Sequence, residues 1–73
     1  MNVNLLRAKM ALKGDFTWTA LADFLGLSRA SLTGRLADEI DWTVPEIRKI
    51  VIKYDLSAEE TCKIFGFKID DEN

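Results

Sequence analysis

The stretch that decides the fold is residues 18–36, which read WTALADFLGLSRASLTGRL. Two short helices that meet at a steep angle need a small residue where their backbones cross and a glycine that can take positive φ in the turn. Ala22 is the small residue, and Gly26 is the turn glycine four positions later. The inner positions of the pair are apolar: Leu21, Leu25, Leu27 and Leu32. This spacing predicts a helix-turn-helix between about residues 17 and 36.

Start and stop signals on both sides of this stretch predict three more helices. Hydroxyl residues that can cap a first turn stand at four of the starts: Thr17, Ser28, Thr43 and Ser57. Glu46 and Glu60 each follow one of these caps by three residues, which is the spacing of a capping box. No segment alternates as a strand would. We therefore expect an all-α fold with helices over about residues 4–13, 17–25, 28–37, 43–54 and 57–66.

Three of these starts also carry the pattern of a hydrophobic staple, with one apolar residue before the cap and another four residues after it. The pairs are Phe16 with Leu21, Leu27 with Leu32, and Trp42 with Ile47. We expect each pair to make contact and to fix the angle at which the chain enters its helix.

Length and composition predict one folded domain over residues 1–73. Apolar residues make up 48% of the chain and charged residues 30%, which is typical of water-soluble globular domains. No run of residues approaches the ~18 apolar residues of a membrane span, and the lone Cys62 has no partner for an internal disulfide. We expect a cytoplasmic protein without a membrane association, in which the acidic tail at residues 67–73 frays.

Charge is divided unequally between the two halves of the chain, although the whole carries only −2. Residues 1–36 hold five basic and two acidic side chains, for a balance of +3, whereas residues 37–73 hold five basic and ten acidic, for a balance of −5. The asymmetry indicates that the first half faces an anionic partner.

Catalysis is not expected from this composition. The chain has no histidine, no pair of carboxylates in a shielded setting and no glycine-rich phosphate loop. One cysteine and scattered carboxylates do not make a metal-binding set. We expect no enzymatic activity, no cofactor, no metal and no small-molecule substrate.

Together with residues 18–36, the segments TVPEIRKI at 43–50 and LSAEE at 56–60 resemble the Cro and repressor type of helix-turn-helix protein of temperate phages and prophages, an XRE-like family. The resemblance covers the chain from Leu5 to Phe65. It implies a five-helix lambda-repressor-like domain in the bacterial host cytoplasm. It also implies a transcriptional regulator in a genetic switch, bound to duplex operator DNA as a homodimer.

In that family the third helix lies in the major groove and the second crosses the backbone. Carried over to this chain, the groove-facing positions are Arg29, Ala30, Ser31, Thr33 and Gly34, with Arg35 just beyond. Arg29 is the expected base reader, because a guanidinium can bond two acceptors of guanine at once. The expected phosphate contacts are Thr17, Thr19, Arg35 and the amide ends of the two helices at Trp18 and Ser28.

A second hypothesis keeps the fold but assigns it another partner. Many relatives have glutamine where this chain has Trp18, and Ala30 and Gly34 offer little for recognition. Trp18 is able to donate its indole N–H to a phosphate, or to anchor a protein interface. The alternative function is therefore a modulator or antirepressor that binds a partner phage repressor protein. Phe65 and Phe67 are candidates for either the core or a dimer contact.

Overall fold

The computed structural model describes residues 1–66, and these form five helices and no strand. The helices are α1 (Val3–Leu12), α2 (Trp18–Leu25), α3 (Arg29–Leu36), α4 (Val44–Tyr54) and α5 (Ala58–Phe65). The prediction of an all-α protein is confirmed for this range. The tail at 67–73, including Phe67, lies outside the described residues. None of the five helices has the length and apolar character that crossing a bilayer requires.

The observed helix bounds agree with the predicted ones to within one residue, because each start is set by a local cap. Side-chain oxygens of Thr17, Ser28, Thr43 and Ser57 each accept a hydrogen bond from an amide in the following first turn. Both predicted capping boxes, with Glu46 and Glu60, are present. The first helix begins one residue early because Asn2 caps it, a role that the sequence analysis did not assign.

One of the three predicted staples is wrong. Phe16 is 74% exposed, whereas Leu21 is completely buried, so most of the phenyl ring lies outside the core. Leu27 and Trp42 are partly buried and pack against the core, and their expected contacts with Leu32 and Ile47 stay predictions. The ring of Trp42 meets Phe65 edge-on, with centroids 5.4 Å apart and planes at 81°. Phe65 therefore contributes to packing within the domain.

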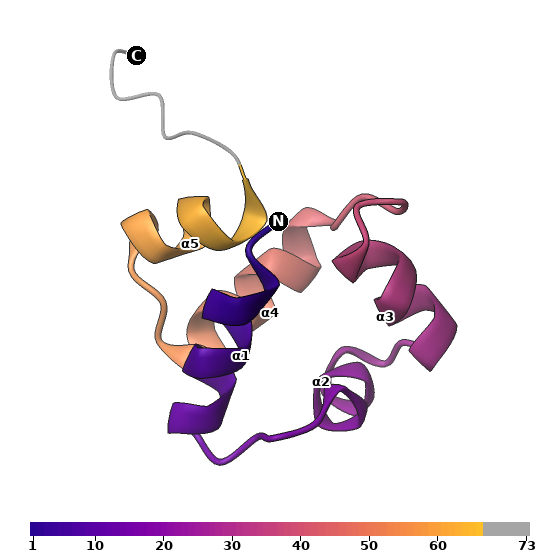
Figure 1. The fold of residues 1–73 in the computed structure, drawn as a ribbon, viewed down its shortest axis with the longest axis horizontal. Helices are drawn as coiled ribbons and strands as arrows, with labels where there is room; N and C mark the ends of the chain where they lie inside the picture. The colour runs from indigo at the N-terminus through magenta and orange to yellow at the C-terminus, as the bar shows by residue number, and fades with distance from the viewer. Residues whose placement is uncertain (67–73) are drawn as a thin grey trace.

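The helices form two groups around one core (Figure 1). Helix α1 packs against α4 and α5, while α2 and α3 pack against each other beside them. Every helix supplies at least one buried side chain: Leu6, Met10, Leu21, Ala22, Leu25, Leu32, Ile50, Tyr54 and Ile64, with Leu56 from the α4–α5 linker. Burial of each large apolar side chain contributes roughly 1.5–3 kcal/mol, so the core holds α2 and α3 at a fixed place on the domain.

A polar contact at the edge of this core ties Tyr54 to the linker that leads into α2. Tyr54 is buried, and its hydroxyl donates a hydrogen bond of 2.8 Å to Oδ2 of Asp15. Burial and this hydrogen bond both raise the pKa of the Tyr54 phenol above its ordinary value, so the hydroxyl keeps its proton and remains a donor. The contact joins α4 to the segment between α1 and α2.

The end of α3 depends on a glycine. Gly34 is buried, and its carbonyl accepts hydrogen bonds from the amides of Glu39 (2.8 Å) and Ile40 (3.1 Å) as the chain turns back. A Cβ at this position would lie 2.5 Å from Cδ1 and 2.9 Å from Cγ1 of Ile40. Gly34 is therefore the site of a close approach between α3 and the loop after it.

The close approach predicts how Gly34→Ala changes stability. Alanine improves helix propensity by about 1 kcal/mol, but in the wild-type chain its methyl group displaces the Ile40 side chain. We expect Gly34→Ala to raise the free energy of unfolding by about 1 kcal/mol more in an Ile40→Ala background than in the wild type. Urea unfolding of the four proteins in this cycle measures the difference. Equal effects in both backgrounds would contradict the packing described here.

Candidate nucleic-acid interface

Helix α3 presents one face to the core and another to solvent. Leu32 is completely buried, and Leu36 packs against the core from one turn later. The residues on the outer side are Arg29, Ala30 and Thr33, which are exposed, and Ser31, which is half-buried. Gly34, expected among the groove-facing positions, is buried against Ile40 instead, so that expectation is wrong. The outer surface of α3 is consequently formed by four residues of its first half: Arg29, Ala30, Ser31 and Thr33.

Arg29 stands at the first position of α3 and is linked to α2. Its Nη1 donates a hydrogen bond of 3.0 Å to the hydroxyl of Thr19, and both side chains are exposed. Within residues 1–66 no carboxylate lies within ion-pair distance of this guanidinium. The structure therefore brings together two predicted site residues from different helices and leaves the positive charge of Arg29 unneutralised.

Thr17 and Ser28, two other predicted contacts, lie exposed at the starts of α2 and α3. The Thr17 hydroxyl accepts a hydrogen bond of 3.2 Å from the Ala20 amide, and the Ser28 hydroxyl accepts one of 3.0 Å from the Ser31 amide. A hydroxyl that accepts in this way still has its own hydrogen to donate. Both caps are able to hold their helix start and to bond an anion at once.

An open groove of about 580 Å³ runs between α1 and the starts of α2 and α3. Its lining includes Asn4, Arg7, Phe16, Thr17, Trp18 and Arg29. Three of these six, Asn4, Arg7 and Phe16, were not among the predicted site residues. The sequence holds no local signal for Asn4 and Arg7, because they lie on α1, ten or more residues before Thr17.

Trp18 is half-buried rather than free. It packs against the core, and the guanidinium carbon of Arg7 lies 5.6 Å from the centre of its ring. A cation over the face of tryptophan is attracted by the ring quadrupole, by roughly 0.5–1 kcal/mol at exposed sites. Trp18 thus forms part of the groove wall and holds Arg7 beside it.

The groove lining also contains one carboxylate, that of Asp15, and its charge is balanced by Lys53 of α4. Asp15 lines the groove and accepts the hydrogen bond from Tyr54. The amino group of Lys53 lies 3.7 Å from the same Oδ2 atom. Lys53 also lies over the ring of Phe24, with its nitrogen 4.7 Å from the ring centre. With Asp15 paired in this way, Arg7 and Arg29 dominate the charge of the groove.

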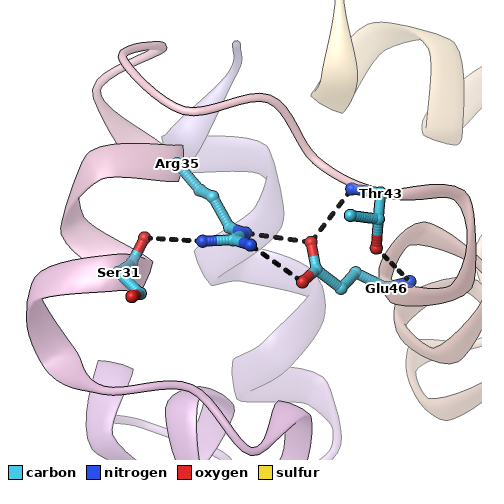
Figure 2. A network of polar contacts seen from close by, with 4 residues as sticks. All are labelled: Ser31, Arg35, Thr43 and Glu46. Atoms are coloured by element: carbon cyan, nitrogen blue, oxygen red, sulfur yellow. Dashed lines mark hydrogen bonds and ion pairs between the residues drawn. The ribbon is translucent and has the colours of Figure 1, made fainter.

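Arg35 does not lie on the exposed surface, and its predicted role as a phosphate contact is not supported by its position. Its Nε donates to Oε1 of Glu46 at 2.9 Å and its Nη2 to Oε2 at 3.0 Å, which makes a two-bond ion pair between α3 and α4 (Figure 2). Its Nη1 donates to the Ser31 carbonyl at 3.1 Å. The two side chains of the pair are only 12% and 14% exposed. The guanidinium is therefore occupied within the protein.

The Glu46 carboxylate has three donors, as Figure 2 shows, because Oε1 also accepts from the Thr43 amide at 3.0 Å. Burial by itself would raise the pKa of this carboxyl, but the hydrogen bonds from Arg35 and Thr43 and the charge of Arg35 outweigh burial and lower the pKa. A carboxyl with a lowered folded-state pKa stabilises the fold above its unfolded-state pKa, and that contribution is lost as the pH falls through the folded-state value.

We therefore expect Glu46→Gln to reduce the free energy of unfolding by about 1–3 kcal/mol at pH 7, since it removes hydrogen bonds between charged groups. The difference in the free energy of unfolding between wild type and variant is largest at neutral pH. It shrinks below about pH 4, where the wild-type carboxyl becomes protonated and loses its charge. Chemical unfolding between pH 3 and pH 7 measures it. Glu39→Gln, at an exposed position, is the matched control and is expected to change stability little. A loss that stays constant with pH would contradict the ion-pair account.

Comparisons with protein-family models, with curated proteins and with solved structures gave no significant match to this chain. The candidate interface is consequently defined by its own residues and geometry. They are Arg29, Thr19, the two caps, Ala30, Ser31 and Thr33, together with the groove beside α1.

Proposed function

We propose that this protein is a sequence-specific DNA-binding transcriptional regulator of the Cro and repressor type, with α2 and α3 as its helix-turn-helix and α3 as the recognition helix. The observation that carries the proposal is the state of Arg29. Its guanidinium is exposed on the first turn of α3, is held by Thr19 and has no carboxylate partner within residues 1–66. An exposed, oriented and unneutralised arginine at the start of a protruding helix fits the major-groove edge of guanine.

The hydrogen bond to Thr19 leaves donors for a base. A guanidinium has five N–H groups, and Nη1 uses one of them on Thr19. The remaining donors are sufficient for a two-bond contact with O6 and N7 of guanine. Ala30 offers a methyl group for contact with thymine, and Thr33 offers a hydroxyl on the same exposed face. Base reading thus falls to few side chains, with phosphate contacts at Thr17 and Ser28 setting the orientation.

The overall net charge of −2 is compatible with a DNA partner because the acidic residues lie mostly elsewhere. Glu46, Glu60 and Glu59 are paired with Arg35, Lys9 and Lys63 respectively. Asp15, the one carboxylate in the groove lining, is paired with Lys53. Both charged residues of α3, Arg29 and Arg35, are basic, and local potential rather than total charge governs association.

The proposal is tested by selecting a binding sequence from a random duplex pool and measuring affinity by fluorescence anisotropy. We expect Arg29→Ala to weaken binding to the selected duplex by about 1–3 kcal/mol and to bring it close to the affinity for unrelated duplexes. Arg48→Ala, which removes the same charge from an exposed position on α4, is the matched control and is expected to have little effect. Failure of the wild type to bind any duplex at low salt would refute the proposal.

Thr19 is expected to act as a positioning residue for Arg29. Thr19→Val keeps the shape of the side chain but removes the acceptor of the 3.0 Å hydrogen bond. We expect binding to the selected duplex to weaken by about 0.5–1.5 kcal/mol, with unchanged binding to unrelated duplexes and an unchanged melting temperature. Competition binding measures the affinity of the variant for the selected duplex and for unrelated duplexes separately. An equal loss on both would assign Thr19 to phosphate binding instead.

The alternative function is capture of a partner phage repressor. Its grounds are the net acidity of the chain, Trp18 in place of glutamine, and the small residues Ala30 and Gly34. The half-buried position of Trp18 beneath Arg7 gives less support to an interface anchored by this residue. Salt dependence separates the two functions, because the affinity for DNA falls steeply as salt rises whereas the affinity of an apolar protein interface does not.

If the regulator binds as a homodimer on a pseudo-palindromic operator, its half-sites lie about 34–36 Å apart.

A further inference from the structure

We propose that α1 takes part in DNA binding through Arg7, which contacts a phosphodiester group of a strand that lies in the groove between α1 and the starts of α2 and α3. This inference rests on the proposed function and extends it to a helix that lies outside the helix-turn-helix. Nothing in the local sequence around Arg7 distinguishes it from other exposed basic residues of the chain.

The size of the groove favours a length of polymer over a single small ion. Its volume is about 580 Å³, against roughly 30 Å³ for one water molecule in the liquid. It is partly open to solvent, and its lining extends from Asn4 on α1 to Arg29 on α3. A sugar–phosphate chain that passes the first turn of α3 has room to continue along α1.

The charge of the groove fits the same occupant. Five basic side chains of residues 1–66 have no carboxylate partner: Arg7, Lys13, Arg29, Arg48 and Lys49. Two of the five, Arg7 and Arg29, line this one groove, while the only acidic residue of the lining is paired with Lys53. Each basic side chain that meets a phosphate releases condensed counterions from the duplex, which favours binding.

Arg7 is already held where a strand would pass. The ring of Trp18 lies 5.6 Å from its guanidinium carbon, and Trp18 is itself packed against the core. A side chain that is ordered before binding loses less conformational entropy when it binds. Within residues 1–66 Arg7 forms no ion pair, so its N–H donors are available for a phosphate. Trp18 therefore acts through Arg7 as a positioning residue.

The experiment measures the salt dependence of DNA affinity for full-length wild type, Arg7→Gln, Arg7→Lys and Arg48→Gln. Arg7→Gln and Arg48→Gln remove the same charge from exposed helix positions, so any general effect of net charge is equal in both. We expect Arg7→Gln to lower the slope of log affinity against log salt by about 1 and to weaken binding about fivefold at 0.15 M salt. The loss is expected to be equal for the selected and unrelated duplexes, because a phosphate contact carries no base preference.

Arg7→Lys is expected to restore the slope, since it restores the charge, and Arg48→Gln is expected to keep the wild-type slope. Equal slopes for Arg7→Gln and Arg48→Gln would overturn the role of Arg7 and leave the proposed function standing. Absence of wild-type binding to any duplex would overturn both. A circular dichroism melt of each variant shows that the compared proteins are folded.

A second arm separates a DNA strand from a free anion. Inorganic phosphate is titrated into the wild type at constant ionic strength, with the fluorescence of Trp18 followed in a Trp42→Phe background. We expect no saturable change up to 10 mM phosphate. Saturable binding that disappears in Arg7→Gln would assign the groove to a small phosphate ligand and overturn the proposal.

Discussion

A single carboxylate joins the two parts of the structure on which the interface depends. Glu46 lies in the first turn of α4, where it completes the capping box with Thr43, and its two oxygens also receive both bonds from Arg35 at the far end of α3. Helix α3 is only eight residues long, too short to be stable in isolation, and its orientation depends on what it packs against. Leu32 secures its inner face in the core, and the ion pair secures its last turn to α4.

The opposite end of α3 carries Arg29, the proposed base-reading residue. The last turn of α3 is fixed by Arg35 and Gly34. Its first turn holds Arg29 exposed, with a hydrogen bond to Thr19. The start of α2 is fixed independently, through Asp15 and its hydrogen bond from Tyr54. A preorganised binding surface requires exposed side chains on helices that are themselves held rigidly by the rest of the domain. The attachment of α3 at its last turn and of α2 through Asp15 provides this.

The sequence predicted the helices well because helix ends are determined locally. The hydroxyl caps, the two capping boxes and the left-handed Gly26 (φ 72°) each act within four or five residues, and each is present in the structure. The errors came from contacts between distant positions. Arg35 and Glu46 are eleven residues apart, Gly34 is covered by a loop residue, and Arg7 on α1 meets Trp18 on α2, eleven residues later. Arg29 was placed correctly in the exposed first turn of α3, since that position follows directly from the cap before it. Its proposed base contact stays a prediction.

The three-donor arrangement at Glu46 has a consequence for how the domain moves. A carboxylate shared between two helices couples their local opening. Fraying of the first turn of α4 removes the acceptor of Arg35, and loosening of α3 removes two of the three donors of Glu46. Backbone amides at the end of α3 and at the start of α4 would then exchange with solvent as one cooperative unit rather than as two separate helix ends. The loop between them, residues 37–43, would open with the same unit, so that the candidate interface loses its support in a single step.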